Sequence, residues 1–158
     1  MNNTGNYLTF SLGELAFGIT ATDVLELNNS LEVTVVPKSP PTVHGIANLR
    51  GQIVPAINMY ARLGLKNISG RRETISIILK CDGILIAVMV DKVGEIIPLE
   101  EDTFEPPPNN FSPMARDLVL GVHKLPDRLL LILDYTKILT GIAMPTAQRA
   151  GLLANAPN

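Results

Sequence analysis

Residues 7–19, YLTFSLGELAFGI, carry the pattern that decides the fold. Apolar side chains alternate with polar or small ones as far as Leu12, and after Gly13 the alternation resumes through Ile19. A period of two on both sides of a glycine turn is typical of a β-hairpin. The same alternation predicts further strands near residues 32–36, 43–49, 52–57, 74–80, 84–90, 93–99, 118–124 and 129–134. The chain is therefore predicted to be all-β.

Helix is expected only over residues 58–65 and 135–139, where the apolar spacing directly after a strand suits about two turns. The apolar positions of the strands also predict the core, because alternate side chains of a strand lie on one face. The expected core residues are Leu8, Phe10, Phe17, Ile19, Ile57, Ile77, Leu79, Ile86, Val88 and Leu131 or Leu133.

The chain contains this pattern twice. At one constant offset Phe10 matches Leu79, and Glu26 in the motif Val-x-Glu-Leu matches Glu95 in Val-x-Glu-Ile. Other matched pairs are Phe17 with Ile86, Ile19 with Val88 and Gly45 with Gly121, the last at a slightly larger offset. Two copies of this size are each marginal as independent domains, because small units bury too little surface. We therefore expect two related β-barrels that share a hydrophobic seam.

The expected domain boundaries follow from the two copies. A single domain should span residues 7–140, with a crossing point near the charged segment 67–73 and a proline-rich loop at 106–110. The expected units are a flexible N-terminus at 1–6, one barrel at about 7–66, the other at about 74–139, and a tail at 141–158 with a possible short helix near 147–154.

Composition excludes several classes of function. The 158 residues hold 13 basic and 15 acidic side chains, and Arg71-Arg72 is the longest basic run, so nucleic acid is not an expected partner. The apolar runs fall short of the roughly 20 residues that a membrane span needs, and residues 1–6 lack the pattern of a signal peptide. The lone Cys81 excludes an internal disulfide and fits the cytoplasm.

Catalytic and metal-binding motifs are not recognisable in the sequence. His44 and His123 occupy related places beside glycines, where a half-buried or surface histidine is far more common than a catalytic one. Asp134 ends a strand and is expected to cap the following helix. We expect neither enzyme activity, nor a cofactor, nor a metal. The alternative is a small-ligand-binding protein or enzyme with a pocket at the seam between the barrels.

Residues 45–58, GIANLRGQIVPAIN, are the most informative segment for function. Alternation places Asn48 and Arg50 on one face, beside flat aliphatic surface and a turn at Gly51. A planar donor surrounded by apolar neighbours suits a contact with a partner protein. The alternative is that Arg50 pairs with a carboxylate such as Glu26 to close the barrel, and spacing alone leaves both open.

These segments together resemble the CheW-like family of chemotaxis coupling proteins. The resemblance rests on residues 7–19, Val24-Leu25-Glu26-Leu27, Thr34-Val35-Val36-Pro37, the core Gly-x-x-Asn-Leu-Arg-Gly at 45–51 and Ile53-Val54-Pro55-Ala56-Ile57. It runs in order from Tyr7 to about Leu139 and departs from the family pattern at Asn58 and at Met59-Tyr60. It implies two five-stranded SH3-like barrels around a shared hydrophobic seam.

The resemblance also implies a function. It predicts a non-catalytic cytoplasmic adaptor that links the tips of chemoreceptors to the regulatory domain of a CheA-type histidine kinase, in arrays at the inner membrane. The residues that match receptor-contact positions, at the groove where the barrels meet, are Val24, Glu26, Asn48 and Arg50. The residues that match kinase-facing positions are Val33, Gly45 and Ile53.

Overall fold

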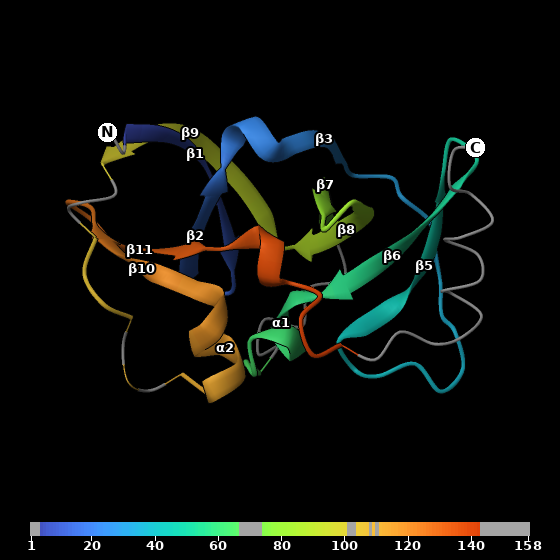
Figure 1. Ribbon diagram of the computed structural model, residues 1–158. Helices are drawn as coiled ribbons and strands as arrows, with labels where there is room; N and C mark the ends of the chain where they lie inside the picture. The colour runs from blue at the N-terminus through green and yellow to red at the C-terminus, as the bar shows by residue number, and fades with distance from the viewer. Residues whose placement is uncertain (1–3, 67–73, 101–103, 108, 110, 143–158) are drawn as a thin grey trace.

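Two β-sheets lie side by side in the computed structural model, which describes residues 4–66, 74–100, 104–107, 109 and 111–142 (Figure 1). Sheet A has the order β10-β11-β2-β1-β9 and sheet B the order β3-β7-β8-β6-β5-β4. Sheet A comprises β1 (Thr4–Leu12), β2 (Leu15–Thr20), β9 (Lys92–Glu100), β10 (Val119–Lys124) and β11 (Leu129–Leu133). Sheet B comprises β3 (Val24–Asn28), β4 (Val33–Thr34), β5 (Val43–Leu49), β6 (Gln52–Asn58), β7 (Ile75–Cys81) and β8 (Ile84–Val90). The expected all-β fold of two small barrels is confirmed.

The expected barrel boundaries at 7–66 and 74–139 are wrong, because the two repeats exchange strands. Sheet B is built from one continuous stretch, 24–90, whereas sheet A joins the N-terminal hairpin to strands after residue 91. In each sheet a parallel pair joins the two repeats: β2 with β11, and β8 with β6. Alternation marks a strand and its buried face but not its neighbour, so the sequence pattern could not show this exchange.

The matched strands of the two repeats nevertheless occupy equivalent places. The order β10-β11-β2-β1-β9 in sheet A corresponds strand by strand to β5-β6-β8-β7-β3 in sheet B, with β4 added beyond β5. Each sheet therefore combines the first hairpin of one repeat with three strands of the other. The duplication read from the sequence is preserved as a pseudo-symmetric pair of sheets.

The largest core fills the seam between the sheets. All of the core residues expected from alternation lie in it, with exposures of 5% or less. Smaller clusters lie on the other face of each sheet, around Val54 and Ile78 in sheet B and around Leu130 and Ile132 in sheet A. Strands such as β8, ILIAVMV, are apolar on both faces because they separate the seam from a barrel interior.

Among the described residues, three short helical turns follow strands, and a fourth, α2, directly precedes β10. They are η1 (Ala21–Asp23), α1 (Met59–Arg62), α2 (Pro113–Leu118) and η3 (Tyr135–Lys137). Asn58 caps α1 by accepting a hydrogen bond from the Ala61 amide at 3.3 Å, and Asp134 caps η3 as predicted. Helix α2 was not expected, although Ser112 before Pro113 is a recognisable N-terminal signal.

Two boundaries differ from the expectation. Strand β1 begins at Thr4, which pairs with Glu100 at the end of β9. Residues 4–6 therefore belong to the sheet rather than to a flexible N-terminus. The strand expected over 32–36 is limited to the two residues of β4. The tail expected at 141–158 lies, after Ile142, outside the described residues.

Candidate functional site

Arg50 lies in an unusual backbone conformation at the tip of the β5–β6 hairpin. Leu49 pairs with Gln52, so Arg50 and Gly51 form a two-residue turn, with φ of 50° and 86°. Such turns favour Asn, Asp or Gly at the first position, since other side chains are strained at positive φ. An arginine at this positive-φ position is therefore better explained by the contacts of its side chain than by the turn itself.

Glu26 on β3 forms an ion pair with Arg50. Strand β3 is one edge of sheet B, and the β5–β6 hairpin lies near the opposite edge, so the pair spans the opening of the curled sheet. The Arg50 side chain is 73% exposed and that of Glu26 is 26% exposed. The hydrogen bond that Arg50 donates to Glu26, and then the negative charge of that carboxylate, raise the pKa of Arg50 above its ordinary value, so the guanidinium stays charged. Arg50 therefore pairs with Glu26 and is exposed to solvent, and its contact with a partner protein stays a prediction.

A groove of about 260 Å³ opens between these edges. Its lining combines one ion pair with aliphatic side chains, among which Leu25 is 57% exposed. The lining residues are Leu25, Glu26, Leu49, Arg50, Gln52, Ile78 and Leu85. All of them belong to sheet B, so this groove opens on the interior of one barrel and not, as expected, where the two barrels meet.

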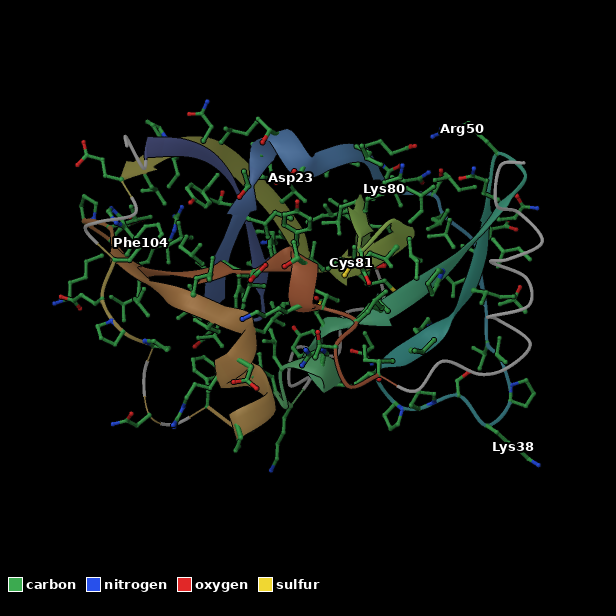
Figure 2. The ribbon with its side chains drawn as sticks, viewed as in Figure 1. Asp23, Lys38, Arg50, Lys80, Cys81 and Phe104 are labelled. Carbon is green, nitrogen blue, oxygen red and sulfur yellow. The ribbon has the colours of Figure 1, made fainter. Side chains whose placement is uncertain are left out.

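The other two residues predicted to face the receptor, Val24 and Asn48, are not part of the groove lining. Val24, at the start of β3, is half-buried and packs against the central core at the seam. Asn48 is exposed on β5, and its Oδ1 accepts a hydrogen bond from the Gly51 amide at 2.9 Å. Asn48 therefore holds the turn that presents Arg50 (Figure 2). The four predicted residues lie on one sheet, with Glu26 and Arg50 in direct contact.

The residues predicted to face the kinase lie where β4, β5 and β6 pair. Val33 pairs with Ala47 and packs against the interior of sheet B, while Ile53 on β6 is half-buried. A Cβ atom on Gly45 would lie 2.2 Å from the Thr34 carbonyl oxygen. Gly45 is thus required for the close approach of β4, which is a structural reason for glycine here.

His44 and His123 do not form a pair, because they lie on different sheets. His44 is exposed on β5, and the ring of His123 meets Phe104 edge to face at 5.8 Å. Within the described residues, no group of three or more His, Cys, Asp or Glu side chains could hold a metal ion. In the same part of the chain, none of the helices is long and apolar enough to cross a membrane.

Sequence reasoning missed two polar features at the seam. Arg62 on α1 is only 2% exposed, and its Nε donates to the Ile138 carbonyl at 2.6 Å. Tyr60 donates to Oδ2 of Asp91 at 2.5 Å, and the same oxygen accepts from the Gly13 amide at 2.7 Å. The only available signal was the departure from the family pattern at Tyr60, since periodicity carries no information about polar partners.

Comparison with known proteins identifies the family. The CheW-like domain matches residues 6–143. The chain belongs to the CheW-like domain family. A chemotaxis protein CheW from Klebsiella aerogenes is 28% identical over 138 residues, which is 87% of this chain and 83% of that protein. The CheW of Helicobacter pylori is 28% identical over 133 residues, 84% of this chain and 80% of that protein.

A solved structure agrees with this assignment. The crystal structure of the scaffolding protein TtCheW from Thermoanaerobacter tengcongensis matches with a TM-score of 0.77 and 30% identity, over 88% of both chains. CheW-like proteins are non-catalytic scaffolds that couple receptors to the kinase CheA in chemotaxis, and this chain is such an adaptor. The alternative of an enzyme or ligand-binding protein with a pocket in the seam finds no support, since side chains of both sheets fill the seam.

Proposed function

We propose that this adaptor binds the cytoplasmic tips of chemoreceptors through Val24, Glu26, Asn48 and Arg50, and the regulatory domain of a CheA-type kinase through Val33, Gly45 and Ile53. It acts in the cytoplasm, in receptor arrays at the inner membrane. The observation that carries the receptor side is the exposed Glu26–Arg50 pair at the rim of an aliphatic groove.

The chemistry of the groove suits a helical receptor tip. Leu25, Ile78 and Leu85 offer aliphatic surface, and the Arg50 guanidinium can donate hydrogen bonds to carbonyl or carboxylate oxygens while it stays beside Glu26. An arginine beside apolar surface is a common anchor of protein interfaces. The two-residue turn, with positive φ at Arg50 and Gly51, fixes the backbone that carries this arginine beside the groove.

The kinase side rests on a different argument. Gly45 lacks a side chain, so it acts by letting β4 approach β5, where Val33 pairs with Ala47 and faces the interior, while Ile53 pairs with Asn48 on the other face. Ile53 is half-buried and offers part of its side chain to a partner. The two proposed surfaces share sheet B and meet on β5, where Asn48 of the receptor set pairs with Ile53 of the kinase set.

The test is the affinity of the full chain for a receptor-tip fragment and for a kinase regulatory-domain fragment, measured by calorimetry. Arg50→Ala should weaken receptor binding by roughly 30-fold, the effect expected of an interfacial arginine, and leave kinase binding unchanged. The matched control is Arg128→Ala, which removes an arginine paired with Asp127 in the corresponding hairpin of sheet A. Equal affinities for wild type and Arg50→Ala would contradict the receptor assignment.

A further inference from the structure

Strand β3 contains a β-bulge at Leu25. Val24 pairs with Leu79 of β7. Two residues further along β3, Glu26 pairs with Ile78, which is directly beside Leu79 in β7. Leu25 is therefore the extra residue of the bulge. Because adjacent residues of a strand lie on opposite faces, Val24 and Glu26 face opposite sides of sheet B although they are two residues apart.

The bulge decides what each side chain of β3 contacts. Leu79 belongs to the central core, and Val24 packs against that core at the seam. Ile78 lines the groove, and so does Glu26, which pairs there with Arg50. In a regular strand, Val24 and Glu26 would lie on one face. The bulge thus allows one short edge strand to serve the core and the groove together.

The extra residue itself belongs to the groove. The Leu25 side chain is 57% exposed and lines the groove with the aliphatic side chains of Leu49, Ile78 and Leu85. As the extra residue it takes no place in the register with β7. Bulges recur beside functional sites because they re-aim a side chain in this way.

Sheet A has the same bulge with a different residue in it. In β9, Gly94 and Glu95 lie opposite the single residue Thr9 of β1. At the offset that relates the two repeats, Gly94 corresponds to Leu25 and Thr9 to Ile78. Thr9 Oγ1 donates to the Glu95 carbonyl at 2.7 Å, and a Cβ atom on Gly94 would lie 2.6 Å from that Oγ1. In sheet A the bulge therefore excludes a side chain.

We propose that Leu25 is a specificity-determining contact of the receptor-facing groove and receives an apolar side chain of the receptor tip. The bulge recurs in both sheets and forms without a leucine in sheet A, so the leucine adds apolar surface toward the groove rather than stability to the strand. This inference rests on the proposed receptor surface.

The position of Leu25 beside Arg50 also defines the chemistry of the partner. The receptor helix should carry, on one face, an apolar side chain for Leu25 and an oxygen acceptor for the Arg50 guanidinium. On a helix, side chains three or four positions apart are neighbours and supply such a pair. The sheet A bulge, with glycine at this position, offers no equivalent apolar contact.

The test compares two unbranched side chains of similar size at position 25 in the full chain. Leu25→Met keeps the apolar surface and should bind a receptor-tip fragment within about threefold of wild type. Leu25→Gln should weaken that binding about tenfold or more, because the amide must be desolvated against aliphatic side chains. Affinity for the kinase fragment should not change in either variant. Equal receptor affinities of the two variants, measured by calorimetry, would overturn the proposal.

A matched control and a second measurement separate direct contact from a structural role. Leu120 on β10 of sheet A is 55% exposed, and Leu120→Gln should leave receptor affinity unchanged. In the wild-type chain, addition of the receptor fragment should shift the methyl NMR signals of Leu25 and not those of Leu120. Unshifted Leu25 signals, or a joint loss of stability, receptor binding and kinase binding in Leu25→Gln, would refute the contact.

The same titrations distinguish this inference from the proposed function. If Arg50→Ala weakens receptor binding and Leu25→Gln does not, the receptor surface stands and the role of Leu25 is wrong. If Leu25→Gln weakens receptor binding and Arg50→Ala does not, Leu25 stands and Arg50 is not an anchor. A wild-type chain without affinity for the receptor fragment would refute both.

Discussion

Sheets A and B share one arrangement of five strands. They differ in the turn of the hairpin that faces the edge strand, β3 in sheet B and β9 in sheet A. In sheet B the β5–β6 hairpin ends in a two-residue turn, and Arg50 reaches across to Glu26. In sheet A the matching β10–β11 hairpin ends in a longer loop closed by a hydrogen bond from the Leu125 amide to the Arg128 carbonyl at 2.8 Å. The two sheets thus share a scaffold, and the groove bridged by an ion pair is described for sheet B.

The two sheets are alike at the other edge, next to β5 in sheet B and β10 in sheet A. Gly45 lets the Thr34 carbonyl approach β5, and Gly121 lets the Glu105 carbonyl approach β10, where Glu105 and Val122 form an isolated bridge. The same device therefore covers both edges. The close approach at Gly45 thus recurs in sheet A, whereas Arg50 has no counterpart of the same kind, because the matching hairpin of sheet A ends in a longer loop.

The largest expected effect tests the shared core. Phe17 in sheet A is fully buried and stacks on Phe10 with ring centroids 5.5 Å apart, and its counterpart in sheet B is Ile86. Phe17→Ala should lower the free energy of unfolding by about 3–5 kcal/mol, and Ile86→Val by about 0.5–1.5 kcal/mol. Chemical denaturation measures both. Wild-type stability of Phe17→Ala would refute a single core shared by the sheets.

The next effect tests an asymmetry at the seam. Arg62 donates to the Ile138, Lys137 and Thr140 carbonyls, so Arg62→Met leaves the buried Ile138 acceptor and two part-buried acceptors without these donors. The expected loss is about 2–4 kcal/mol of unfolding free energy. Arg62→Lys, which keeps the charge but loses the planar fork, should recover part of it. If the methionine variant is as stable as wild type, these bonds do not hold η3.

A smaller effect compares the two glycines. A Cβ on Gly45 would lie 2.2 Å from the Thr34 carbonyl oxygen, and one on Gly121 would lie 2.9 Å from that of Glu105. Gly45→Ala should therefore cost about 1–3 kcal/mol, and Gly121→Ala less. Kinase binding should weaken only in Gly45→Ala, because β4 moves with Val33. Loss of kinase binding without loss of stability would instead make Gly45 a direct contact.

Much of the fold could be predicted because alternation determines which side chains share a face. The core residues and the hairpins at Gly13 and Gly51 followed from that pattern alone. The exchange of strands between the repeats could not follow from it, since pairing depends on long-range packing of apolar surfaces that look alike in sequence. Helix α2 was missed because the proline-rich segment directly before it is typical of a loop, although Ser112 and Pro113 are a helix N-terminal signal.

The candidate site was predicted in part. The sequence pointed to Arg50 and Glu26 and left open whether they pair, and the structure shows that they do. The sequence gave no indication that Ile78 of β7 and Leu85 of β8 would complete the groove, because these two strands belong to the second repeat.

The smallest expected change in stability is the sharpest test of what sets sheet B apart. Arg50 has φ of 50° at the first turn position, whereas Asp82 occupies the same position of the β7–β8 hairpin with φ of 53°. Asparagine is preferred there because its short polar side chain tolerates positive φ. Arg50→Asn should therefore keep or slightly raise the melting temperature, while receptor binding weakens at least tenfold. Asp82→Asn, the control in the other hairpin, should change neither property. A fall in melting temperature in Arg50→Asn would mean that the Glu26–Arg50 pair stabilises the barrel more than the strained turn costs, and the pair would then belong to the fold of sheet B before it belongs to recognition.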